Sequence, residues 1–235
     1  MNLQEYLEKK KTQLPKYRTL CLNCRQPDFR CYCSEIQKFD PGIKFVILIH
    51  PIEVRRPIAT GRLSYLCMED AELIVGHQYS QHPRVNGIIH DSKYHSVVLY
   101  PGRSATNLTL LSSEERREFF PKNKKLVIFV IDGTWNTAKK TLHLSPNLQR
   151  LPQIFFTPPR ASTFRVRTQP KPECYSSVEA IHHTIELVGD FSMPDLESQK
   201  HNILLSVFDH IVEKQLAYVK PKNTRHSKKS VPKTR

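Results

Sequence analysis

The chain has 235 residues, and 39% of them are hydrophobic, which is enough to bury a core and excludes a wholly disordered protein. Its formal charge is +14, from 36 Lys and Arg against 22 Asp and Glu. Because cations that bind phosphates release counterions, a surplus of this size predicts a polyanionic partner. Half of the surplus lies in residues 220–235, which hold seven Lys and Arg and no acid. A solubilising tail is the alternative explanation for that cluster.

Three regions can be distinguished along the chain. Residues 1–40 are a basic segment, with a helix expected over residues 3–11, followed by a cysteine-rich module. Residues 41–218 form the main domain, and residues 219–235 are a basic tail, too poor in apolar residues to pack. The first residues lack the apolar stretch of a secretory signal, and no window is apolar enough to span a bilayer. We therefore expect a cytoplasmic protein with no membrane segment.

The main domain alternates between short apolar runs and amphipathic stretches. The apolar runs predict strands over residues 45–49, 97–100 and 126–131, with shorter candidates at 88–89 and 154–156. The amphipathic stretches predict helices over residues 112–120, 134–144, from Ser176 onward, and 196–218. Ser176 and Glu179 have the spacing of a capping box, which marks the start of the third helix. Strands that alternate with helices predict an α/β domain with a mainly parallel sheet and flanking helices.

Four of the six cysteines lie within thirteen residues, at Cys21, Cys24, Cys31 and Cys33. Zinc takes four thiolates in a tetrahedral shell, and two short chelating pairs joined by a loop can supply them. Two local disulfides or unrelated thiols are the alternatives, and a reducing compartment disfavours the first of these. A Cys₄ shell leaves no open position for water, so we expect a structural zinc module. Cys67 and Cys174 stand alone and are expected to be packing residues.

Polar and glycine-containing segments follow three of the predicted strands, where ligands bind in open α/β sheets. The first runs from His50 to Arg62, the second from Tyr100 to Ser104, and the third from Asp132 to Lys140. In the third segment an acid directly follows six apolar residues, and Gly133 permits a sharp turn. Asp132 could accept a proton or fix a ligand, Thr134 could cap the next helix, and Trp135 would stand on its first turn. A plain helix cap with a core indole is the alternative.

A further segment, residues 158–167, combines basic and aromatic side chains. In an extended chain Arg165 and Arg167 would share one face, where they could bind successive phosphates. A solvated edge strand would show the same pattern.

Taken together and in this order, these residues resemble the DTW-domain family, the tRNA-uridine aminocarboxypropyltransferases. The resemblance covers roughly residues 20–190. It rests on the cysteine cluster and on four segments: His50-Pro51-Ile52-Glu53…Arg56-Pro57…Thr60-Gly61, Tyr100-Pro101-Gly102, Asp132-Gly133-Thr134-Trp135…Ala138-Lys139, and Arg167…Ser176-Ser177-Val178-Glu179-Ala180. Family members often carry Ser-Thr-x-Glu-Ala in the last segment, and this chain keeps a hydroxyl at both positions.

The resemblance implies a fold similar to SPOUT methyltransferases with a C-terminal trefoil knot. It also implies S-adenosylmethionine as the co-substrate and tRNA as the partner. In that reaction the 3-amino-3-carboxypropyl group passes to N3 of a uridine and methylthioadenosine is released. Asp132 is then the candidate general base or a residue that orients the substrate, and Arg167 or Arg56 would hold the carboxylate of the transferred group. Glu179 or Asp132 would hold its ammonium.

The site residues that follow from this reading form four sets. The catalytic set is Asp132, Thr134 and Trp135. The set that contacts S-adenosylmethionine is Leu99, Tyr100, Pro101, Gly102, Asp132, Gly133, Arg167, Ser176, Ser177 and Glu179. The metal set is Cys21, Cys24, Cys31 and Cys33. The set that contacts RNA is Arg55, Arg56, Arg62, Lys139, Arg160 and Arg165.

Two other functions share part of this pattern. An RNA methyltransferase would use the same co-substrate and a similar fold, but it would release S-adenosylhomocysteine. A non-catalytic, zinc-stabilised RNA-binding protein would have the same charge pattern, but it would not need polar residues at three strand ends. Either a monomer or a homodimer is compatible with the sequence.

Overall fold

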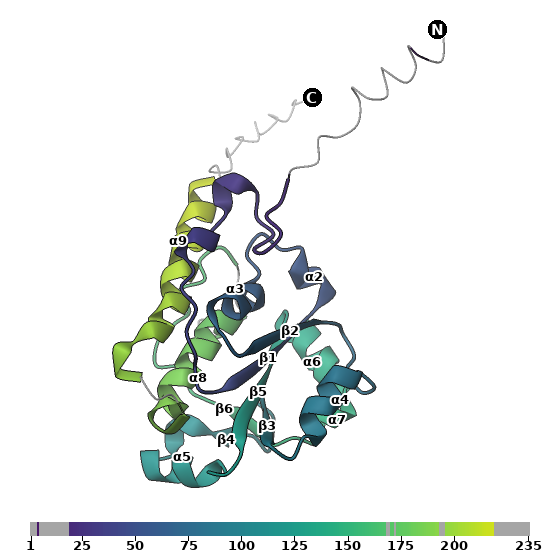
Figure 1. The fold of residues 1–235 in the computed structure, drawn as a ribbon, viewed down its shortest axis with the longest axis vertical. Coiled ribbons are helices and arrows are strands. Elements are labelled where there is room, and N and C mark those ends of the chain that lie inside the picture. Colours follow the sequence, from purple (N-terminus) through teal and green to yellow (C-terminus); the bar gives the residue numbers. More distant parts are fainter. Residues whose placement is uncertain (1–3, 5–18, 168–169, 172, 193–195, 219–235) are drawn as a thin grey trace, which may run out of the picture.

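The computed structural model describes residue 4 and residues 19–167, 170–171, 173–192 and 196–218. The basic tail, and the helix expected over residues 3–11 apart from residue 4, lie outside the described residues. The centre of the molecule is a six-stranded sheet in the order β2-β1-β5-β3-β6-β4, in which every pairing is parallel (Figure 1). The strands are β1 (Lys44–Ile49), β2 (Ala71–Val75), β3 (Tyr94–Leu99), β4 (Thr106–Asn107), β5 (Lys125–Asp132) and β6 (Gln153–Phe155). The predicted α/β class with a mainly parallel sheet is confirmed.

Helices cover both faces of this sheet, as Figure 1 shows. One face packs against α3 (Thr60–Cys67), α5 (Ser113–Phe119), α8 (Ser177–Ser192) and α9 (Ile203–Tyr218). The other face packs against α4 (Pro83–His90), α6 (Trp135–His143) and α7 (Pro146–Gln149). The short helix α2 (Pro51–Val54) follows β1 directly. Parallel strands need such crossover helices, which is why both faces are buried.

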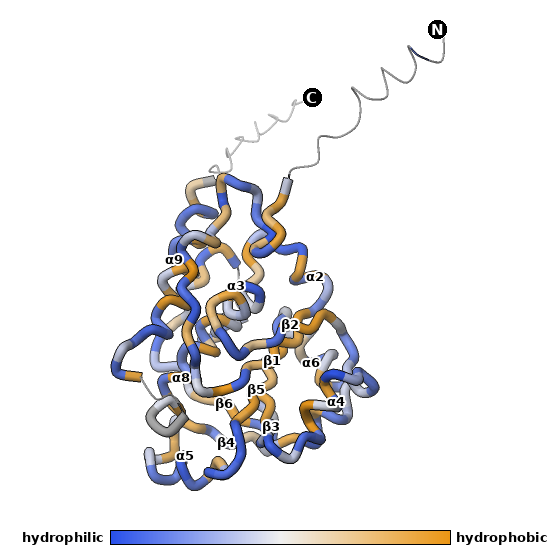
Figure 2. Tube along the Cα trace, viewed as in Figure 1, coloured by the Kyte–Doolittle hydropathy of each residue, from blue (hydrophilic) through white to orange (hydrophobic). Residues whose placement is uncertain are grey.

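The central strands are apolar on both sides because each side belongs to a different core. Phe45 and Ile47 of β1 pack in the core beneath α3 and α8, whereas Val46 and Leu48 pack in the core beneath α4. β5 alternates in the same way, and Figure 2 shows these strands as hydrophobic segments in the middle of the molecule. Full burial of a side chain of this size contributes about 1.5–3 kcal/mol, so β1 and β5 anchor the fold.

Three of the predicted segments differ from the structure. Residues 88–89 are not a strand, because they lie in α4, where Val85 and Ile88 face the core one turn apart. The last helix begins at Ile203 and not at residue 196, since η4 (Leu196–Ser198) and η5 (Lys200–Asn202) are short 3₁₀ segments. Residues 158–167 are not extended throughout, because a turn occupies residues 165–167.

The cysteine module packs against the main domain. Its two 3₁₀ turns are η1 (Asp28–Arg30) and η2 (Cys33–Glu35), and η3 (Leu108–Leu110) follows β4 in the main domain. Cys24 and Tyr32 are buried in the same core as α8 and α9. Glu35 lies 2.9 Å from His210 Nε2 and 3.7 Å from Lys214 Nζ of α9, and Figure 1 shows the module beside that helix. Among the described residues, no helix is both long and apolar enough to cross a membrane.

Candidate active site

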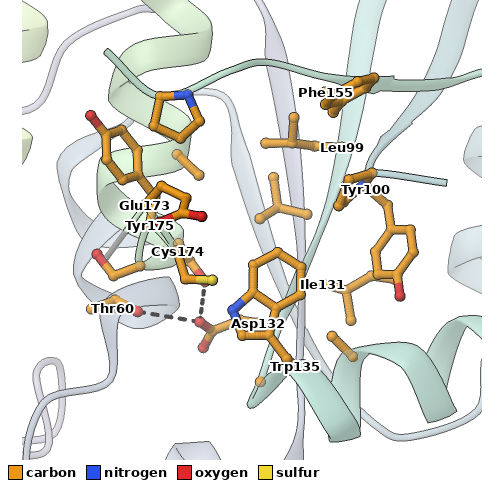
Figure 3. A pocket seen from close by; sticks show the side chains of 18 of the residues that line it. Thr60, Leu99, Tyr100, Ile131, Asp132, Trp135, Phe155, Glu173, Cys174 and Tyr175 are labelled. Carbon is orange, nitrogen blue, oxygen red and sulfur yellow. Dashed lines mark hydrogen bonds between the residues drawn. The ribbon is translucent and has the colours of Figure 1, made fainter. Parts of the chain in front are cut away.

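A cavity of about 600 Å³ opens where the carboxyl ends of β3, β5 and β6 meet the start of α8. Because these strands are parallel, their carboxyl ends lie at one edge of the sheet. Figure 3 shows Leu99, Tyr100 and Phe155 on one side of the cavity and Glu173, Cys174 and Tyr175 on the other. Asp132 and Trp135 lie between the two groups, so an acid and an indole both border the cavity.

Asp132, the last residue of β5, is buried with 4% of its surface exposed. Its Oδ1 atom accepts hydrogen bonds from Ser177 Oγ at 2.5 Å and from Thr60 Oγ1 at 3.3 Å. Its Oδ2 atom is buried and has no hydrogen-bond partner in the described part of the chain. Burial raises the pKa of the Asp132 carboxyl, and nearby Glu53 raises it further, against the opposing effect of the Ser177 hydrogen bond. A buried carboxylate with a raised pKa and a free oxygen is suited to accept a proton.

Gly61 and Thr134 both lie close to Asp132, and local packing explains each of them. A Cβ atom added to Gly61, on the first turn of α3, would lie 2.6 Å from Asp132 Oδ2 and 2.9 Å from Ile47 Cγ2. Thr134 is the N-cap of α6, and its hydroxyl accepts from the N–H of Thr137 at 3.1 Å. The side chain of Thr134 therefore caps the start of α6 and also borders the cavity.

The cavity wall is largely aromatic. Six aromatic side chains line it, from β3, α6, β6 and the loops around them: Tyr100, Trp135, Phe155, Phe156, Phe164 and Tyr175. Trp135 is 39% exposed, so it lies at the opening and is not a core residue. Aromatic faces stack on flat heterocycles, and such a wall suits a purine or pyrimidine base.

A buried ion pair reaches the edge of this cavity. Arg167 donates to both carboxylate oxygens of Glu53, at 3.2 and 3.3 Å, and Arg167 also lines the cavity. Glu53 is 3% exposed, whereas the Arg56 side chain is 53% exposed, with its Nε 4.0 Å from Glu53. The bidentate pair fixes the Arg167 guanidinium in place. Of the two arginines expected to hold a carboxylate, only Arg167 borders the cavity.

The four clustered cysteines have the arrangement of a metal centre. Their Sγ atoms all lie within 4.8 Å of one another, with Cys21 and Cys33 3.7 Å apart and Cys24 and Cys31 3.6 Å apart. Zn–S bonds of about 2.3 Å in a tetrahedron place sulfur atoms about 3.8 Å apart, so the cluster fits a Zn²⁺ ion. Backbone hydrogen bonds from Cys24 and Asn23 lower the pKa of the Cys21 thiol to about 6, which favours the thiolate that a metal needs.

Comparison with known proteins identifies the family. The DTW domain matches residues 18–216. The chain belongs to the DTW-domain family. The match begins before the first cysteine and ends within α9, so the cysteine cluster and the cavity both lie within the family domain.

Several curated proteins are similar in sequence to this chain. The chain is 29% identical to tRNA-uridine aminocarboxypropyltransferase 2 of Drosophila melanogaster in an alignment of 188 positions that covers 77% of this chain and 70% of the relative. It is 29% identical to the protein of that name in Mus musculus (68% and 53% covered) and 26% identical to that in Macaca fascicularis (70% and 54% covered). The chain thus spans about half the length of these two mammalian relatives. No solved structure matches the chain.

Most residues expected to contact S-adenosylmethionine or to act in catalysis lie together in the DTW domain. Those that line the cavity are Leu99, Tyr100, Pro101, Asp132, Gly133, Thr134, Trp135, Arg167, Ser176 and Ser177. Gly102 is not among the lining residues, and a Cβ atom there would lie 1.9 Å from the end of the Gln153 side chain. Glu179 does not line this cavity either.

The carboxylate of Glu179 is occupied by hydrogen bonds from within the protein. Its carboxylate accepts hydrogen bonds from the Ser176 N–H at 2.8 Å and from the Thr163 N–H at 2.7 Å, and the hydroxyls of Ser162 and Ser176 also donate to it. It therefore ties the start of α8 to the loop before Arg167. Of the two acids expected to hold an ammonium group, only Asp132 borders the cavity.

The sequence interpretation also missed several residues of the site. Thr60 was noted only as part of a strand exit, and the lining residues Phe155, Phe156 and Tyr175 were not selected. Aromatic residues directly after β6, the neighbour of β3 in the sheet, were the available signal. Cys174, expected to be a packing residue, also lines the cavity. Cys67 is fully buried as expected, and burial raises the pKa of its thiol to about 12.

The basic residues expected to contact RNA are spread over several elements. Five of them are exposed: Arg55, Arg56, Lys139, Arg160 and Arg165. Arg62 is only partly exposed and lies near Tyr32; burial raises the pKa of that phenol, and the charge of Arg62 opposes the rise. The idea that Arg165 and Arg167 share one face is wrong, because Arg165 pairs with Glu213 of α9 and Arg167 pairs with Glu53.

Proposed function

We propose that this protein is a tRNA-uridine aminocarboxypropyltransferase, which transfers the 3-amino-3-carboxypropyl group of S-adenosylmethionine to N3 of a tRNA uridine. Membership of the DTW family and relatives of that name at 26–29% identity support the proposal. The observation that carries it is the buried Asp132 carboxylate, with one free oxygen, at the base of an aromatic cavity.

The proposed step needs an acceptor for one proton. Asp132 Oδ2 takes the proton from uridine N3 while N3 forms a bond to the γ-carbon of the sulfonium. The bond between that carbon and sulfur breaks, sulfur keeps the electron pair, and methylthioadenosine leaves. The raised pKa of Asp132 makes its carboxylate a stronger base than an exposed one. General-base help of this kind contributes about 10²–10⁴-fold to a rate.

The rest of the cavity is proposed to select which carbon reacts. Arg167, held by Glu53, binds the carboxylate of the transferred group, and the backbone of Leu99, Tyr100 and Pro101 lies against the adenosine. Trp135, at the opening, stacks on the target uracil. Holding the γ-carbon, and not the methyl group, in line with the nucleophile is an orientation effect that can be worth several kcal/mol.

The wider expectations belong to the same proposal. Residues 1–40 form the zinc module and its basic leader, 41–218 the catalytic domain, which is SPOUT-like with a C-terminal knot, and 219–235 a basic tail. Zn²⁺ is structural, held by the four clustered cysteines. The exposed arginines and Lys139 contact tRNA phosphates, and the positive charge supports this. The protein works in the cytoplasm as a monomer or homodimer.

The reaction products test the proposal. Full-length protein is incubated with tRNA and S-adenosylmethionine, and mass spectrometry is used to examine both the tRNA nucleosides and the small molecules. The expected result is 3-(3-amino-3-carboxypropyl)uridine with an equal amount of methylthioadenosine. S-adenosylhomocysteine and a methylated base would assign the protein to the methyltransferases instead. tRNA binding with neither product, across tRNA from several sources, would indicate a non-catalytic RNA-binding protein.

A further inference from the structure

A second cluster of potential metal ligands lies on α8, separate from the cysteines and outside the lining of the active-site cavity. It consists of His182 and Glu186 of α8 and His201 of η5, with His201 1% exposed. Residues four apart on a helix share a face, so the first two side chains point the same way. The 3₁₀ turn before α9 brings the third to them.

The distances within this cluster suit a small cation. The ligand atoms of the three residues all lie within 4.8 Å of one another. His201 Nε2 is 2.5 Å from Glu186 Oε1, and His182 Nε2 is 3.9 Å from the same oxygen. Asn202 Oδ1 lies 2.7 Å from His182 Nε2 and adds a fourth donor atom. Zn–N and Zn–O bonds of about 2.0–2.2 Å place tetrahedral ligands about 3.4 Å apart, a spacing that small side-chain rotations would reach.

The surroundings leave access to the cluster from one side. The Glu186 side chain is 46% exposed, and Glu186 and His182 line a cavity of about 480 Å³ together with Arg160 and His183. An ion here would therefore have four protein donor atoms, counting Asn202 Oδ1, and a side open to the cavity.

We propose that His182, Glu186 and His201 form a second metal site, for a divalent transition-metal ion such as Zn²⁺, Co²⁺ or Ni²⁺. Two imidazoles and one carboxylate suit these ions, whereas Mg²⁺ and Ca²⁺ prefer ligand sets made of oxygen atoms. The ion replaces the hydrogen bond that now joins His201 to Glu186 and the one that joins His182 to Asn202, and it links α8 to the segment before α9. This site is independent of the proposed transfer reaction.

The test uses full-length protein whose cysteine cluster is first loaded with Zn²⁺ and which is then titrated with Co²⁺. Cobalt bound by nitrogen and oxygen absorbs weakly in the visible range, whereas cobalt bound by thiolates adds strong sulfur-to-metal charge transfer. The expected result is binding of one further ion without that charge-transfer band. Glu186→Gln and His182→Gln should each weaken this binding at least tenfold. Glu118→Gln, an exposed glutamate of α5, is the matched control and should bind as the unsubstituted chain does.

Thermal unfolding of each variant distinguishes a loss of cobalt binding from a loss of the fold. Glu186 is half exposed, so Glu186→Gln should unfold near the temperature of the unsubstituted chain in the absence of Co²⁺, and only the cobalt-dependent rise should be lost. Three results would overturn the proposal: no further ion in the unsubstituted chain, equal binding by the folded Glu186→Gln variant, or cobalt that appears only with the thiolate band.

Discussion

Gly61→Ala tests whether the Asp132 carboxylate is held in place by close packing. The added Cβ atom would lie 2.6 Å from Asp132 Oδ2, 2.7 Å from its Cγ and 2.9 Å from Ile47 Cγ2. The first distance is about 0.8 Å short of an ordinary contact, so the carboxylate has to move. Overpacking of this kind costs about 1–3 kcal/mol. For a domain of this size each kcal/mol lowers the unfolding midpoint by about 2–4 °C.

Gly87→Ala is the matched control, because nothing lies within 4 Å of a Cβ atom at that position in α4. Alanine is the better helix former, so this variant should gain about 0.5–1 kcal/mol. Thermal unfolding and the rate of uridine modification are measured for both. We expect Gly61→Ala to lose several degrees and at least tenfold in rate, while Gly87→Ala gains stability and keeps its rate. A Gly61→Ala variant with unchanged stability and rate would refute the idea that Asp132 is fixed by this contact.

Three further predictions follow from the site. Arg167→Lys should weaken binding of S-adenosylmethionine about 10- to 100-fold, since charge-assisted hydrogen bonds contribute about 1.5–3 kcal/mol. Arg56→Lys should bind it normally. An equal loss in both variants would contradict the role of Arg167 in holding the carboxylate. Burial raises the pKa of Asp132, so activity should rise with pH through a midpoint above the ordinary value of 3.8. The contribution of this group to stability should fall over the same pH interval, because the native state holds the proton more tightly than the unfolded chain does. A pH-rate profile with its midpoint at or below 3.8 would argue against Asp132 as the base. Cys24→Ser should abolish zinc retention, measured by metal analysis, and lower the unfolding temperature because Cys24 packs in the main core, whereas Cys174→Ser should keep its zinc.

The sequence predicts those strands that are buried on both faces. β1 and β5 are long apolar runs, whereas the prediction for β3 found only its apolar end, because Tyr94, His95 and Ser96 begin that strand. β2 was missed because it is an edge strand that pairs only with β1 and carries Glu72, which binds Arg84. Residues 88–89 were assigned wrongly because two adjacent isoleucines fit a strand as well as one turn of an amphipathic helix.

The site was predictable where chemistry concentrates at a strand end. Asp132 follows an apolar strand directly, and the structure places it, buried, in the lining of the cavity. The role of Glu179 could not be read in the same way. Its partners Ser162 and Thr163 are seventeen and sixteen residues away, and only the tertiary fold shows that they occupy its oxygens. The pairing of Arg167 with Glu53, 114 residues apart, is likewise a property of the fold.

The most direct test of the central claim compares Asp132→Asn with Asp40→Asn, a variant of an exposed aspartate before β1 at the opposite edge of the sheet. Trp135 is the single tryptophan of the chain and lines the cavity, so its fluorescence reports ligand binding in each variant. If Asp132 is the base, Asp132→Asn should still change its fluorescence with S-adenosylmethionine but should form aminocarboxypropyl-uridine at least 100-fold more slowly. The Asp40→Asn variant should modify tRNA at the normal rate. Normal modification by Asp132→Asn would contradict the account.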